Sequence, residues 1–138
     1  MTGDLILSML GSPAAAGLAR TLAAERLRKW DLFHLNDDVA LIVAELVANA
    51  AAATPRAEIR FQVSRDAHGI VIGVWDRSPA MPTARPVREI TLDELDISEE
   101  SFDVNGGWGL PIVEALSASC GCAPDPSGGK WIWARVVP

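Results

Sequence analysis

The chain has 138 residues, 49% of them hydrophobic, which is enough to bury the core of one domain and excludes a disordered chain. Its formal net charge of -6 argues against nucleic acid as the main partner, because no basic stripe is available to neutralise phosphates. We therefore expect a single domain over residues 1–138 with no direct nucleic acid binding.

Two apolar stretches raise the question of export or membrane insertion. Residues 5–17 follow Asp4 and lack a basic start, so we interpret their first part as a strand rather than a signal peptide. Residues 39–53 contain Glu45 and Asn49 and are too short to span a bilayer. We expect a cytoplasmic protein that does not enter a membrane.

The cysteine pattern favours neither a disulfide nor a zinc site. Cys120 and Cys122 are two residues apart, which disfavours an unstrained bond between them. The histidines, His34 and His68, lie far from them in the sequence. We interpret the cysteines as small strand residues in a reducing cytosol.

The first half of the chain predicts a strand and two helices. The strand covers residues 4–10, and the first helix runs to about residue 30 from Ser12, which can cap it, and Pro13, which suits its first turn. The second helix covers residues 36–54, with acidic residues in its first turn. Its apolar stripe consists of Val39, Ile42, Val43, Leu46 and Ala50.

The next segment predicts an antiparallel hairpin. Residues 57–63 alternate between apolar and polar side chains, and residues 70–75 are almost all apolar. The short turn at residues 65–69 joins the two strands. Ile59, Phe61 and Val63 are expected on one face of the first strand.

The last part of the chain begins with residues 77–106, which have no clear period. A helix follows at about residues 110–118, then strands near 120–123 and over 130–137. The resulting order is β-α-α-β-β-loop-α-β-β. It predicts an α+β fold, a two-layer sandwich in which helices cover one face of a mixed, mostly antiparallel sheet.

Glu45 and Asn49 are the first candidate functional pair. They are four residues apart, so they lie on the same side of the second helix, at the edge of its apolar stripe. Together they offer oxygens to Mg²⁺, or a base and a metal ligand. The alternative is an ordinary polar pair at the boundary of a buried helix face.

Asp76 ends the apolar strand and is followed by Ser78 and Pro79. A carboxylate in this place can accept a hydrogen bond in a pocket, for example from the amino group of a purine. The alternative is an aspartate that only initiates a turn, a role that this residue type often has.

Three glycines, Gly106, Gly107 and Gly109, precede the third predicted helix. They leave backbone N–H groups open at a helix start, where the dipole favours an anion, so a phosphate chain could lie on Gly107 to Leu110. The alternative is a hinge that ends a long loop. The stretch is neither a Walker A loop nor a Rossmann fingerprint.

Taken in order, these stretches resemble the histidine-kinase-like (GHKL, Bergerat-fold) ATPases. ELVANA resembles the N box of that family, VWDRSPAMP its first glycine box and GGWGLPIVEAL its second, and GKWIWARV resembles its closing strand. More narrowly, the chain is similar to the anti-sigma-factor serine kinases and their actinobacterial relatives. The resemblance covers nearly the whole chain.

The resemblance implies a role for each matching residue. Asn49 would hold the Mg²⁺ that bridges the ATP phosphates, and Glu45 would orient or activate the hydroxyl that attacks the γ-phosphate. Asp76 would accept from the adenine amino group, and Ser78 belongs to the same nucleotide-binding box. Residues 77–106 would form the ATP lid. Gly107, Gly109 and Leu110 would let the phosphates approach the backbone.

The chain departs from the family at several charged positions. Ala52 and Ala53 replace a basic or histidine pair, and Trp108 replaces an arginine. Between residues 83 and 105 there are seven acidic and two basic side chains, which suit either a basic partner or a solvated loop. Arg77 and Lys130 are candidate cations near the site, without an assigned role.

The five tryptophans include three whose faces can be predicted. Trp131 and Trp133 alternate in the last strand, so they share one face and pack either in the core or on a dimer surface. Trp75 should lie on the opposite sheet face from Asp76.

Two functions remain open. The first is an ATP-binding regulatory protein that binds Mg-ATP, holds a sigma factor or a related partner, and phosphorylates a serine or threonine of an anti-sigma antagonist. The second is a catalytically weak or inactive module for protein–protein interaction. A histidine-kinase catalytic domain is a third, less favoured reading, and only the resemblance suggests a homodimer.

Overall fold

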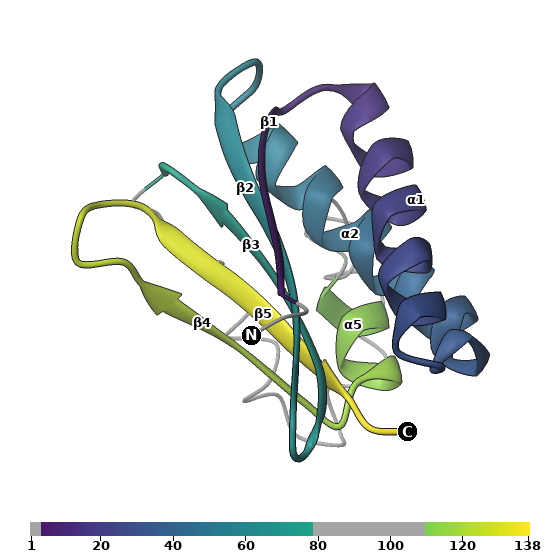
Figure 1. Cartoon of the computed structure of the whole chain (residues 1–138). Coiled ribbons are helices and arrows are strands. Elements are labelled where there is room, and N and C mark those ends of the chain that lie inside the picture. The colour runs from purple at the N-terminus through teal and green to yellow at the C-terminus, as the bar shows by residue number, and fades with distance from the viewer. Residues whose placement is uncertain (1–3, 79–109) are drawn as a thin grey trace, which may run out of the picture.

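The computed structural model describes residues 4–78 and 110–138 (Figure 1). The predicted order of elements is confirmed in this part of the chain. The elements are β1 (Leu5–Leu10), α1 (Pro13–Lys29), the 3₁₀ turn η1 (Phe33–Leu35), α2 (Asn36–Ala53), β2 (Glu58–Asp66), β3 (Gly69–Asp76), α5 (Leu110–Leu116), β4 (Ser119–Pro124) and β5 (Lys130–Val136).

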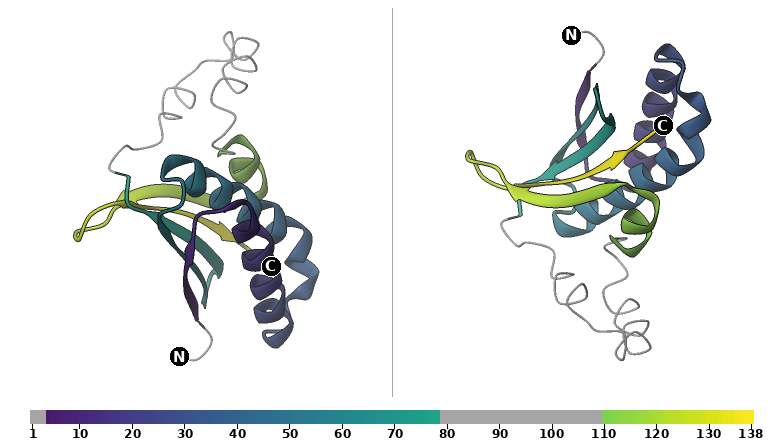
Figure 2. Two further views of the ribbon diagram at one scale, coloured as in Figure 1. Left: turned by 90° about the horizontal axis from the view of Figure 1, so that it is seen from above. Right: turned by 90° about the horizontal axis from the view of Figure 1, so that it is seen from below.

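The five strands form one sheet in the order β1-β2-β3-β5-β4, and all of these neighbours are antiparallel. Helices α1, α2 and α5 lie together on one face of this sheet, as both views in Figure 2 show. The predicted α+β two-layer sandwich is therefore confirmed. β3 lies at the centre of the sheet, so its end is enclosed by neighbours on both sides.

The core lies between the sheet and the helices. Ile59, Phe61 and Val63 of β2 are fully buried, as their alternation predicted. The β2–β3 hairpin is tighter than expected, because pairing continues to Asp66 and Gly69 and leaves a two-residue loop where residues 65–69 were predicted. Gly69 has a positive φ of 143°, which a residue with a side chain would adopt only with strain.

Helix α1 packs on α2 through small side chains. Its buried positions are Ala15, Ala19, Ala23 and Leu27, which recur every four residues and allow a close approach of the two helices.

Ser12 is the N-cap residue of α1, but its side chain makes no capping hydrogen bond, so the expected side-chain cap was wrong. Pro13 occupies the first turn as predicted, where its missing N–H costs nothing.

Successive side chains of β5 point to opposite faces of the sheet, one toward the helices and the other outward. Lys130, Ile132, Ala134 and Val136 are buried toward the helices, whereas Trp131 and Trp133 lie on the outer face of the sheet. The tryptophans rest on glycines of the neighbouring strands, since a β-carbon at Gly121 would lie 2.9 Å from the Trp133 ring and one at Gly73 3.3 Å from the Trp131 ring. Of the two expected alternatives, packing in the helix-covered core was therefore wrong, and a dimer surface stays a prediction.

Trp75 also lies on the outer face, opposite Asp76, as predicted. The guanidinium of Arg60 lies 4.3 Å from the centre of its ring, and its indole N–H donates to the carbonyl oxygen of Gly128 at 2.9 Å. These contacts bury Trp75 without a covering helix.

Cys120 and Cys122 both lie in β4 and pack against the core without forming a disulfide.

None of the helices within residues 4–78 and 110–138 is both long and apolar enough to cross a membrane.

Phe61→Ala tests the position of the core. Phe61 is fully buried, so we expect the free energy of unfolding to fall by about 3–5 kcal/mol, from lost burial and the cavity left behind. Urea denaturation measures this change. Leu41→Ala, at a side chain on α2 that is 51% exposed, is the control and should change stability by less than about 0.5 kcal/mol. Equal effects of the two variants would contradict the placement of Phe61.

Asp66→Asn tests a pH-dependent contact that ties the β2–β3 hairpin to β5. Arg135 donates to both oxygens of Asp66 at 2.7 Å, and the His68 backbone N–H donates at 2.8 Å; these bonds hold the pKa of Asp66 below its ordinary value of 3.8. A lowered pKa stabilises the folded state at pH values above 3.8, and this contribution disappears as the pH falls through the folded-state pKa.

The wild type should therefore be slightly more stable than Asp66→Asn at neutral pH, and the difference should shrink below pH 3.8. Denaturation at a series of pH values measures it. A difference that persists unchanged in acid would show that the charge of Asp66 is not its source.

Candidate functional site

Asp76 is the centre of the candidate site. It is the last residue of β3, the central strand, and it faces the helix layer at 1% exposure. Its Oδ1 accepts one hydrogen bond from the Nζ of Lys130 at 2.7 Å and another from the backbone N–H of Ser78 at 2.9 Å. The contact with Ser78 is the turn contact that the alternative interpretation of Asp76 requires, so this carboxylate does initiate a turn.

The other oxygen of the carboxylate, Oδ2, is buried and has no hydrogen-bond partner. It is the one such side-chain atom in the described part of the chain. A buried acceptor without a donor costs free energy, and native proteins rarely leave one unless something else binds there. Turn formation uses only Oδ1, so the hydrogen-bonding capacity of Oδ2 is unused among the described residues.

Lys130 is a candidate site residue to which the sequence analysis assigned no role. It is the first residue of β5, stands directly opposite Asp76 in the β3–β5 register, and is 3% exposed. Its Nζ also lies 3.5 Å from the carbonyl oxygen of Ser78. The signal was present in the sequence, because Lys130 is in phase with the buried positions Ile132 and Ala134.

Asn49 and Glu45 lie on α2, one turn apart, as predicted. Asn49 belongs to the buried face of the helix at 6% exposure, whereas Glu45 is half-buried. Helix α2 packs against both β3, which ends in Asp76, and α5, which begins at Leu110. The amide and the carboxylate therefore come from the element that packs against both β3 and α5.

The remaining predicted site residues are described in part. Ser78 joins the Asp76 cluster through its backbone, and Leu110 is the first residue of α5. Gly107 and Gly109 lie outside the described residues, as do Trp108 and all but the first two residues of the predicted lid. The structure thus brings Asp76, Ser78 and Lys130 together by direct contacts, and positions Asn49 and Glu45 on the neighbouring helix.

Both basic residues expected near the site lie beside carboxylates of the chain. Lys130 pairs with Asp76, and the guanidinium of Arg77 lies 3.9 Å from the carboxylate of Glu58, with 58% of its side chain exposed. Hydrogen bonds from Ser8 and Arg60, with the nearby charge of Arg77, hold the pKa of Glu58 below its ordinary value. The exposed Ala52 and Ala53 add no charge at the end of α2.

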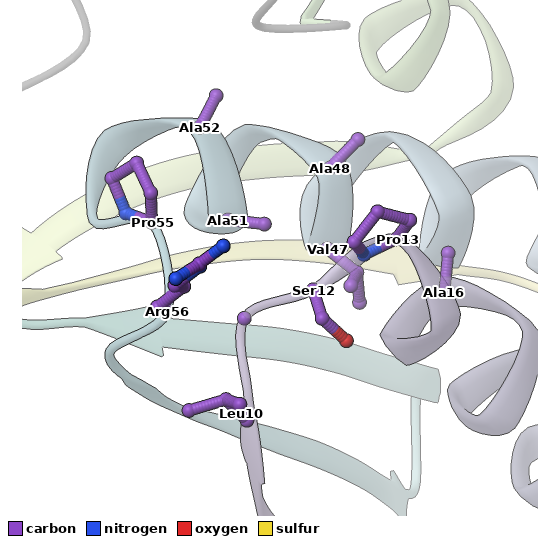
Figure 3. A pocket seen from close by; sticks show the side chains of 11 residues that line it. Leu10, Ser12, Pro13, Ala16, Val47, Ala48, Ala51, Ala52, Pro55 and Arg56 are labelled. Carbon is purple, nitrogen blue, oxygen red and sulfur yellow. The ribbon is translucent and has the colours of Figure 1, made fainter.

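A separate apolar groove lies at the junction of β1, α1 and the second half of α2 (Figure 3). Among the described residues its lining includes none of the candidate site residues, and Arg56 is the one charged residue there. The groove is lined by Leu10, Gly11, Ser12, Pro13, Ala16, Val47, Ala48, Ala51, Ala52, Pro55 and Arg56. It is therefore distinct from the polar site at the end of β3.

Asp76 and Asn49 offer oxygen atoms of the kind that a nucleotide and a magnesium ion require. The free Oδ2 of Asp76 fits an amino donor such as that of a purine. The buried amide of Asn49 offers one oxygen, a fitting ligand for Mg²⁺, which usually takes one or two protein ligands and completes its shell with water and substrate phosphates.

Comparison with known proteins agrees with this geometry. A family model described as the histidine kinase-like ATPase domain matches residues 11–136, which include every described element except β1. No curated protein matches the chain at a significant level. Because the match spans most of the chain and agrees with the observed sandwich, the protein belongs to the histidine kinase-like ATPase domain family, a family of ATP-binding domains.

Proposed function

We propose that this protein is an ATP-binding regulatory protein of the anti-sigma-factor serine kinase type, acting in the cytoplasm. It binds Mg-ATP and a sigma factor or an anti-sigma antagonist, and it phosphorylates a serine or threonine of the antagonist. The observation that carries the nucleotide part of this proposal is the buried, unpartnered Oδ2 of Asp76 in a chain of this ATPase family.

In this proposal Asp76 recognises the base. The adenine amino group donates to Oδ2, which gives a buried acceptor the partner that it lacks among the described residues. Ser78 and Lys130 keep the carboxylate in place through Oδ1.

Asn49 and Glu45 serve the phosphate end of the nucleotide. The amide oxygen of Asn49 would hold Mg²⁺, which neutralises charge on the phosphates when it is bound. Glu45 is half-buried one turn earlier, so part of its side chain stays exposed to solvent. It would accept the proton of the attacking hydroxyl. Gly107 and Gly109 would let the phosphates approach the backbone ahead of α5.

The partner side of the proposal rests on the resemblance and on charge. The acidic stretch between residues 83 and 105 suits a basic surface on the partner. A homodimer is part of the same proposal. A pull-down with and without ATP is the direct test of the partner.

A second candidate function is a protein-interaction module with weak or absent catalysis. The exposed, uncharged Ala52 and Ala53 favour it, because family members often carry basic side chains there. Calorimetry with Mg-ATP separates the two candidates. Wild-type protein that gives no binding heat would contradict the first candidate and leave the second.

Asn49→Ala tests the metal-dependent part of ATP binding. Removing the amide oxygen takes away a ligand of Mg²⁺, so we expect the affinity for Mg-ATP to fall about tenfold or more. The affinity for ATP in the presence of EDTA should change little. Calorimetry measures both. An equal loss with and without the metal would contradict a role of Asn49 in holding Mg²⁺.

Glu45→Gln tests the transfer step. Loss of a general base should slow phosphorylation of the antagonist about 10²–10⁴-fold, while the affinity for Mg-ATP stays nearly unchanged. Phosphorylation is followed by mass spectrometry, and binding by calorimetry. Glu25→Gln, the same change at an exposed position of α1, is the matched control and should keep full activity. Unimpaired transfer by Glu45→Gln would remove Glu45 from the mechanism.

A further inference from the structure

Lys130 has an environment that differs from that of the other lysine in the chain. Lys29 is exposed at the end of α1, whereas Lys130 is 3% exposed and its ammonium contacts Asp76, which is 1% exposed. Burying two charges costs several kcal/mol each, and their attraction offsets this only in good geometry, so such a pair is weak evidence for a purely stabilising role. The contact lies within the proposed base site, which suggests a role in binding.

The hydrogen bonds of the Asp76 carboxylate determine what it can offer a ligand. Each carboxylate oxygen accepts about two hydrogen bonds. Oδ1 already accepts two, from the Nζ of Lys130 and from the N–H of Ser78. Oδ2 accepts none. The carboxylate therefore presents one oxygen to a ligand instead of two.

A single acceptor distinguishes between purines. Adenine carries an amino donor at position 6, which needs one acceptor oxygen. Guanine carries an N–H and an amino group side by side at positions 1 and 2, and this pair is bound best by a carboxylate with both oxygens free. A carboxylate whose Oδ1 is occupied can still accept from the amino group of adenine, but it can pair with only one of the two neighbouring donors of guanine.

We propose that Lys130 is a positioning residue for base selection: it occupies Oδ1 of Asp76, so that only Oδ2 faces the nucleotide and adenine is selected over guanine. This inference rests on the proposed ATP binding and adds the residue that restricts it. Lys130 acts through Asp76, and its charge also balances that of the buried carboxylate.

The first measurement uses the wild-type protein and the magnesium complexes of ATP, GTP and ITP. ITP has the guanine ring without the 2-amino group, so it reports whether that group gains a partner. We expect ATP to bind about tenfold more tightly than GTP, the scale of a lost base contact, and GTP and ITP to bind equally. Binding of GTP as tight as that of ATP would overturn the inference.

Two variants then test Lys130 itself. In Lys130→Met the ammonium is gone and Oδ1 regains a free acceptor position, so GTP should gain affinity relative to ITP and the ratio of ATP to GTP affinity should fall about tenfold. Lys130→Arg keeps the charge, but its forked guanidinium can donate to both carboxylate oxygens and so competes with the adenine amino group for Oδ2. ATP affinity should then fall about tenfold in a folded protein.

Lys29→Met is the matched control, because it makes the same substitution at the exposed lysine. It should leave all three affinities unchanged. Lys130→Met leaves a buried carboxylate without its cation and can prevent folding, so thermal unfolding is measured for each variant. A purely structural ion pair predicts that Lys130→Arg binds ATP like the wild type, and that result would overturn the inference.

The two proposals fail in different ways. Wild-type protein that binds none of the three nucleotides contradicts ATP binding, and base selection falls with it. Wild-type protein that binds ATP while a folded Lys130 variant keeps the wild-type order of affinities contradicts base selection alone.

Discussion

The ion pair between Asp76 and Lys130 is the interaction on which the rest of the site depends. Two charged side chains, each at most 3% exposed, face the helix layer from neighbouring central strands. Each charge has the other as its partner 2.7 Å away, at the point where the last residue of β3 stands opposite the first residue of β5. The pair also leaves one carboxylate oxygen buried and without a hydrogen-bond partner, at the place proposed for the nucleotide base.

The sheet separates two surfaces with different chemistry. Its helix-covered face holds the core and, at the end of β3, the polar site. Its outer face carries Trp75, Trp131 and Trp133, with Trp131 and Trp133 resting on glycines of neighbouring strands. Glycine makes room for the large rings, so these tryptophans bury apolar area without a second layer of helices. The apolar groove beside β1 is a third surface, and its described lining includes none of the candidate site residues.

The candidate site was predictable where local spacing decides the outcome. Glu45 and Asn49 share a helix side because they are four residues apart, and Asp76 ends a strand because the apolar run stops there. Lys130 was harder to assign. Its burial follows from strand alternation, but its role follows from standing opposite Asp76, which requires the pairing of strands that are 54 residues apart in the sequence. No local pattern specifies that pairing.

The sequence by itself determined the order of elements, the amphipathic faces of α2 and β2, and the family resemblance, because periodicity and motif spacing are local properties. The tertiary structure decided the sheet order, the outer position of the tryptophans and the division of the Asp76 carboxylate into an occupied and a free oxygen. Each of these depends on which strands pair and in what register. Strand pairing is a long-range choice among similar hydrophobic segments, and only the packed molecule resolves it.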